Sequence, residues 1–171
     1  MNSSRWNDFD HRWLERLGVA DRPGHRRRAA IILAHSGDSW FWLAGLGILW
    51  LTAHDPWRAW AAKMALSILA LAVIVMIIKF SIRRERPAGE WGAIYRRSDP
   101  HSFPSGHAAR AVMLAVLAIG WGPAWLAVLL ALWAPLVSLA RVLMGLHYPT
   151  DVIAGGAIGL LGGVISVLLF P

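Results

Sequence analysis

The sequence contains no cysteine among its 171 residues. This absence excludes disulfides, thiolate metal sites and a cysteine nucleophile, and it leaves the redox compartment open. Charged residues are also scarce, at 16% of the chain against about 25% in an average soluble domain. Hydrophobic residues make up 57% and are gathered in blocks that approach membrane thickness. The composition therefore excludes an ordinary water-soluble domain, and the length suits a single domain.

The charges that are present are mostly positive. There are 17 Lys and Arg against 10 Asp and Glu, which gives a formal net charge of +7. In a membrane protein such an excess marks topology and contact with anionic lipids, so we expect membrane lipids as partners and no nucleic acid. Eleven Trp against two Tyr suit an aromatic belt at the membrane interface.

The first 28 residues are polar and basic, without a continuous apolar run. We therefore expect no secretory signal peptide in this segment. Trp6, Phe9 and Trp13 recur at helical spacing while charged residues fill the other face. This pattern predicts an amphipathic helix lying in the membrane interface, the alternative being a frayed tail. We expect residues 29–171 to form the membrane-embedded domain.

Apolar segments long enough to cross a membrane recur five times after this point. We therefore predict an all-α fold, a polytopic bundle of about five transmembrane helices. The predicted spans cover about residues 29–51, 57–79, 105–121, 123–141 and 151–170. Gly122-Pro123 makes a tight turn, so the third and fourth spans form a hairpin.

A row of glycines marks the last predicted span. Gly155, Gly159 and Gly163 lie four residues apart, a spacing that lets membrane helices approach closely. We expect this face to pack within the bundle. A homodimer through the same face is the alternative.

Ionisable and small polar residues collect at the ends of the predicted spans, where their placement suggests function. One membrane face holds the ends of the second and fourth spans and the starts of the third and fifth. We therefore expect these residues to converge on one pocket. They are Lys79, Arg86, Ser105, His107, Arg141, His147 and Asp151.

The cations of this group predict a phosphate site. Lys79, Arg86 and Arg141 can neutralise phosphoryl oxygens, the arginines through bidentate hydrogen bonds. Backbone N–H groups of Ser105 and Gly106, at a helix start, would add donors and the positive end of the helix dipole. The sequence offers no carboxylate-rich or cysteine cluster for a divalent metal, so we expect no metal and no cofactor.

The two histidines divide into a nucleophile and an acid. His147 lies four residues before Asp151, and a carboxylate bonded to one ring nitrogen would leave the other free to attack phosphorus. His107 would then protonate the leaving oxygen.

Other polar residues near these positions carry weaker signals. His35 and Asp38 either line the headgroup entrance or form a helix-packing pair. We leave four arginines out of the site as solvated or lipid-contacting groups: Arg83, Arg84, Arg96 and Arg97. Four loop residues are candidates for headgroup selection: Trp91, Tyr95, Asp99 and His101.

Three motifs in order resemble the type 2 phosphatidic acid phosphatase superfamily, membrane lipid phosphatases related to vanadium haloperoxidases. The first, Lys then six residues then Arg-Pro, matches residues 79–87. The second, Pro-Ser-Gly-His, is intact at residues 104–107. The third, Ser-Arg then five residues, His, three residues and Asp, matches residues 140–151 except that Ala140 replaces the serine. The usual bacterial member has six spanning helices, so the resemblance implies that the amphipathic segment stands here in place of the family's first helix.

The resemblance implies a metal-independent phosphatase that forms a phosphohistidine at His147 and resolves it with water. Substrates in the family are phosphatidic acid, phosphatidylglycerol phosphate and isoprenyl phosphates and diphosphates. Two alternatives stay open: a lipid phosphotransferase with the same intermediate, and a non-catalytic membrane protein that binds lipid phosphate.

The resemblance also places the chain in the bacterial cytoplasmic membrane. Only Arg58 and Lys63 among the basic residues belong to the face opposite the motifs. Because Lys and Arg in short loops favour the cytoplasm, we predict an active site that opens to the cytoplasm.

Overall fold

A computed structural model describes residues 3–19, 24–88 and 99–170. Within these residues the chain forms seven helices and no strand, which confirms the predicted all-α class. The helices are α1 (Ser3–Leu17), α2 (His25–Ser36), α3 (Ser39–Thr52), α4 (Trp57–Ile82), α6 (Gly106–Trp121), α7 (Ala124–Leu143) and α8 (Pro149–Leu169).

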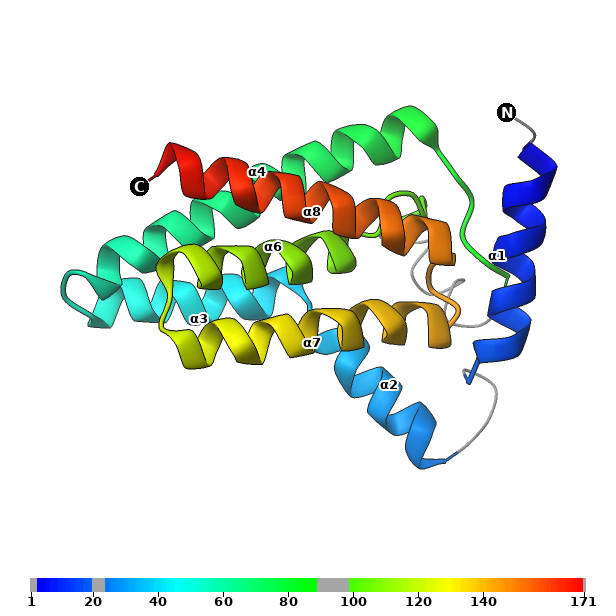
Figure 1. Ribbon diagram of the computed structural model, residues 1–171, viewed down its shortest axis with the longest axis horizontal. Coiled ribbons are helices and arrows are strands. Elements are labelled where there is room, and N and C mark those ends of the chain that lie inside the picture. Colours follow the sequence, from blue (N-terminus) through cyan, green and yellow to red (C-terminus); the bar gives the residue numbers. More distant parts are fainter. Residues whose placement is uncertain (1–2, 20–23, 89–98, 171) are drawn as a thin grey trace.

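Five of the helices form an elongated bundle, with α1 across one end and the C-terminus near the other (Figure 1). Helix α6 packs against both α7 and α8, and α3 packs against α4. Leu46, Met64, Leu114 and Val137 are buried where these helices meet. The bundle therefore has its apolar core between α3, α4, α6 and α7.

Among the residues that the structure describes, three helices are long and apolar enough to cross a membrane: α4, α7 and α8. Helices α3 and α6 are apolar but shorter. Leu66, Leu132 and Leu161 are exposed on the outer faces of the three long helices, as expected for surfaces that contact lipid. The chain is thus built as an integral membrane protein, and the count of five spans stays a prediction.

The helix predicted over residues 29–51 is instead two helices, α2 and α3, separated at Gly37. The break is stabilised by indole N–H groups that bind the polar end of α2. Trp42 donates to the Ser36 carbonyl at 3.0 Å, and Trp133 donates to the Ser36 hydroxyl at 2.9 Å. The polar start that the sequence shows for this segment is therefore a turn with satisfied hydrogen bonds.

The glycine row of α8 packs within the bundle, as predicted. Gly155, Gly159 and Gly163 are buried, and a Cβ atom on Gly159 would overlap the backbone of Ala109 in α6. Only residues without a side chain permit this approach. The alternative was a homodimer through this glycine face, which α6 covers in the structure.

Helix α1 spans the segment in which the sequence predicts an N-terminal helix. It contacts α7 and α8, and its Asp10 is fully buried. Its location in the membrane interface stays a prediction.

Candidate active site

The first motif reaches the second through a short antiparallel contact. Helix α4 ends at Arg83, whose left-handed conformation (φ 54°) turns the chain back toward the bundle. Glu85 then forms a β-bridge with His101, and the Ser102 N–H donates to the Arg84 carbonyl at 2.8 Å. Residues 84–86 are therefore held beside the segment that precedes α6.

The third motif is joined to the second by backbone hydrogen bonds. The N–H of His147 donates to the Arg141 carbonyl at 3.3 Å, across a turn in which Gly145 has φ 63°. The N–H of Ser105 donates to the Asp151 carbonyl at 2.9 Å. The ends of α4 and α7 and the starts of α6 and α8 thus meet, as the sequence predicts.

The imidazole of His147 is fixed in one tautomer. Its Nδ1 lies 2.8 Å from the Ser102 carbonyl, which can only accept, and its Nε2 lies 3.2 Å from Nη1 of Arg86, which can only donate. The hydrogen is therefore on Nδ1 and the lone pair is on Nε2. Burial, with the charges of Arg141 and Arg86, holds the pKa of His147 well below its ordinary value. The ring is therefore neutral, with its lone pair on Nε2.

The sequence assigns the orientation of His147 to Asp151, whereas in the structure the hydrogen bond at Nδ1 is made with the Ser102 carbonyl. Oδ2 of Asp151 lies 3.8 Å from Nδ1, too far for a hydrogen bond. That carboxylate accepts instead from the backbone N–H of Tyr148 at 2.9 Å and from Nη1 of Arg84 at 2.6 Å. Asp151 therefore caps α8, and it also bonds the side chain of Ser102, whose carbonyl holds His147.

Two predicted phosphate ligands share a carboxylate of the chain. Nζ of Lys79 donates to both oxygens of Asp99 at 2.8 and 2.6 Å, and Arg86 approaches the same carboxylate at 2.8 Å. Lys79 and Arg86 are almost completely buried. Buried cations that bind a carboxylate have the charge and spacing to bind a phosphate.

The remaining predicted ligands differ in how accessible they are. Arg141 is fully buried and donates to the Ala34 carbonyl at 3.3 Å. Its neighbour Ala140 packs against Ala30 and Ala34 of α2, so the methyl group that replaces the family's serine lies in an apolar contact. The backbone N–H of Ser105 donates to the Asp151 carbonyl in this structure, whereas Gly106 lines the pocket.

A pocket of about 470 Å³ opens at Lys79. Its lining includes Lys79, Asp99, Gly106 and His107 together with apolar residues of α4. Asp38, which the sequence left between two interpretations, lines the pocket and also contacts His107, with 2.6 Å between its Oδ1 and Nε2. The pocket thus combines charged side chains with an apolar wall.

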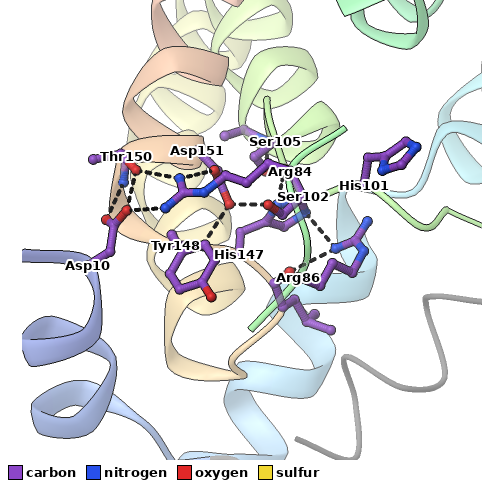
Figure 2. Close-up of polar contacts among 12 residues, drawn as sticks. Asp10, Arg84, Arg86, His101, Ser102, Ser105, His147, Tyr148, Thr150 and Asp151 are labelled. Carbon is purple, nitrogen blue, oxygen red and sulfur yellow. Dashed lines mark hydrogen bonds and ion pairs between the residues drawn. The ribbon is translucent and has the colours of Figure 1, made fainter. Parts of the chain in front are cut away.

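Arg84, which the sequence analysis excluded, belongs to the site. Figure 2 shows its guanidinium between two carboxylates, with Nη1 2.6 Å from Asp151 and Nη2 2.6 Å from Asp10. Asp10 also accepts from the N–H of Thr150 at 3.1 Å and from its hydroxyl at 2.5 Å. The sequence signal for this contact was Asp10. It lies at helical spacing from Leu14 and Leu17, on the apolar face of α1.

The other residues that the sequence singled out lie at the edge of the site or outside the residues that the structure describes. Arg83 is exposed and donates to the Phe80 carbonyl at 2.9 Å. The His101 ring packs edge-on against Phe80. Four residues lie outside the described part of the chain: Trp91, Tyr95, Arg96 and Arg97.

The fold and the site together define a helical membrane protein with a cluster of buried cations at one end of its bundle. The chain belongs to the PAP2 superfamily, which matches residues 60–171.

Relatives and solved structures agree with this membership. The chain is 38% identical over 145 residues to the decaprenylphosphoryl-5-phosphoribose phosphatase of Mycolicibacterium smegmatis, covering 80% of this chain and 74% of that protein. It is 30% identical over 141 residues to the undecaprenyl-diphosphatase of Sulfolobus acidocaldarius, covering 81% and 66%. The fold is shared with the first transmembrane PAP2 type phosphatidylglycerolphosphate phosphatase from Bacillus subtilis, with a TM-score of 0.79, 22% identity and coverage of 98% and 87%.

Proposed function

We propose that this protein hydrolyses a phosphomonoester or diphosphate of a lipid through a phosphohistidine at His147. The observation that carries the proposal is the tautomer of His147, which presents the Nε2 lone pair beside Arg86. Phosphatases among the relatives support the reaction class.

The reaction begins when substrate phosphate replaces Asp99 on Lys79 and Arg86. Arg86 then donates to a phosphoryl oxygen, and Nε2 of His147 is free to attack phosphorus. His107 gives a proton to the leaving oxygen as the P–O bond breaks. Water hydrolyses the phosphohistidine and regenerates both histidines.

The substrate class follows from the pocket and from the relatives. Apolar residues of α4 line the pocket beside the cations, which suits an alkyl or prenyl chain attached to a phosphate. Two relatives are named for prenyl-linked phosphates, so isoprenyl phosphates and diphosphates come first. Phosphatidic acid and phosphatidylglycerol phosphate follow. Because cations occupy the place of carboxylate metal ligands, we propose that no metal takes part.

Phosphate release from a panel of these four lipid classes tests the proposal on the detergent-purified protein. His147→Ala should lower release by at least about a thousandfold, while His54→Ala, at an exposed position, should leave it unchanged. Activity should survive EDTA. Near wild-type release from His147→Ala would refute the nucleophile, and metal-reversible loss in EDTA would refute metal independence. A phosphorylated alcohol in place of free phosphate would identify a phosphotransferase.

A further inference from the structure

We propose that Asp38 is a positioning residue for His107, holding its Nε2 so that Nδ1 exchanges the proton with the leaving oxygen. The inference rests on the proposed phosphatase function and extends it to a residue outside the three motifs. Oδ1 of Asp38 and Nε2 of His107 are 2.6 Å apart, although the residues are 69 positions apart in sequence. A carboxylate and an imidazole at this distance form a strong hydrogen bond.

The carboxylate of Asp38 is ionised, so it can only accept this hydrogen bond. Burial acts to raise the pKa of Asp38, but the hydrogen bonds and charges of His107 and His35 outweigh it and lower the pKa to about 2. The hydrogen must therefore be on Nε2 of His107. Nδ1 is then the ring nitrogen left to exchange a proton with the leaving oxygen.

The turn that carries Asp38 is held by the same helix that carries His107. Nε of Arg110, one turn further along α6, donates to the Gly37 carbonyl at 2.8 Å, and its Nη1 donates to the Ser39 hydroxyl. A Cβ atom on Gly37 would lie 3.2 Å from Cδ2 of His107, so the turn packs directly against the ring. The backbone and the carboxylate together restrict the imidazole to one orientation.

The charges around His107 explain why an acid at this position needs a carboxylate. Arg110 on α6 and Arg141 on α7 both oppose a positive imidazole. Asp38, with His35 behind it, lies on the side of α2 and α3 and supplies the compensating negative charge. Asp38 therefore makes protonation of the ring less costly than it would be beside the two arginines alone.

With this arrangement, the proton that His107 gives up in the first half-reaction is replaced in the second. His107 acts after its Nδ1 has bound a proton, and it gives that proton to the leaving oxygen while the bond from Nε2 of His147 to phosphorus forms. His107 is then neutral, with its Nε2 hydrogen still on Asp38. In the second half-reaction Nδ1 takes a proton from the attacking water, whose oxygen bonds to phosphorus as the P–N bond to His147 breaks.

The test uses two phosphate esters of equal chain length, one of a fatty alcohol and one of an alkyl-substituted nitrophenol. Asp38→Asn keeps the shape of the side chain and removes its charge. Because a nitrophenolate needs no acid, we expect kcat to fall about tenfold to a hundredfold for the alcohol ester and less than about threefold for the nitrophenyl ester. KM should stay within about threefold for both. Asp55→Asn, an exposed aspartate at the far end of α3, should change neither ester.

Two further variants separate positioning from folding. Gly37→Ala keeps the carboxylate but crowds the His107 ring. It should also lower kcat more for the alcohol ester than for the nitrophenyl ester, by a smaller factor than Asp38→Asn does. Asp38→Asn combined with His107→Ala should match His107→Ala alone, because both changes remove one function. Equal losses for the two esters, or no loss, would overturn the inference. If His147→Ala stays active, the proposed function fails instead.

Discussion

At the scale of single residues, Asp99 makes the main contact that substrate has to replace. Its carboxylate joins Lys79 and Arg86, with all three nitrogen to oxygen distances between 2.6 and 2.8 Å. About a third of its side chain is exposed, so it sits at the boundary between the pocket and the buried cations. Phosphate binding is therefore an exchange of one anion for another rather than the filling of an open site.

Asp99→Asn should strengthen anion binding, because the amide no longer competes for the two cations. We expect the inhibition constant for inorganic phosphate to fall about threefold to tenfold, a modest change because solvent partly screens the carboxylate. Steady-state inhibition with a lipid phosphate substrate measures it. Glu85→Gln, at an exposed position on the adjoining segment, serves as the control. Weaker inhibition by phosphate would show that Asp99 instead holds Lys79 in place for binding.

At the scale of helices, the contact between α6 and α8 sets the position of two motifs. Gly159→Ala should be strongly destabilising, because its Cβ would overlap the backbone of Ala109. Gly156→Ala, whose Cβ would lie 3.7 Å from a Val112 methyl group, is the matched control and should be tolerated. We expect the Gly159 variant to lose about 2 kcal/mol or more, as overpacked cores do. Equal thermal unfolding temperatures of the two variants in detergent would contradict the packing argument.

The attachment of α1 to the site is a second property of the helices. Asp10 is buried against Arg84 and Thr150, whereas Asp8 on the same helix is exposed. Asp10→Asn should cost about 2–4 kcal/mol of stability, because it leaves Arg84 and its hydrogen-bond partners incompletely paired. It should also lower turnover, since Arg84 orients Asp151. Asp8→Asn should have little effect on unfolding or activity, and matching behaviour of the two variants would show that α1 is only loosely attached.

At the scale of the whole molecule, the distribution of basic residues bears on which way the site faces. Helix α1 lies at the site end of the bundle and the C-terminus lies at the other (Figure 1). Lys63, one of the two basic residues assigned to that far end, donates to the Phe170 carbonyl at 3.2 Å. We propose that the site end faces the cytoplasm, because Lys and Arg near span ends are retained there.

Single cysteines test this orientation cleanly, because the chain has no native cysteine. We expect an impermeant maleimide to label Phe170→Cys but not Ser3→Cys in intact cells, and to label both after permeabilisation. Labelling of the Ser3 variant alone in intact cells would place the active site on the outer face.

Much of this protein could be read directly from its sequence. The long apolar runs determine helices α4, α7 and α8 because a helix in lipid satisfies its own backbone hydrogen bonds. The glycine spacing of four on α8 determines its close face because the helix repeats at 3.6 residues per turn. The three motifs identify His107, His147 and the cations because each lies at a helix end, where polar groups are costly unless they are used.

Only the tertiary structure decided which partners those residues have. The Ser102 carbonyl selects the tautomer of His147, and a backbone oxygen has no signature in a sequence. Asp38 reaches His107, and Asp10 reaches Arg84, across 69 and 74 positions, and such contacts form only when separate helices pack. Local hydrophobic periodicity determines where each helix begins and ends to within about one turn. Hydrogen-bond partners depend instead on which helix ends the packing brings together.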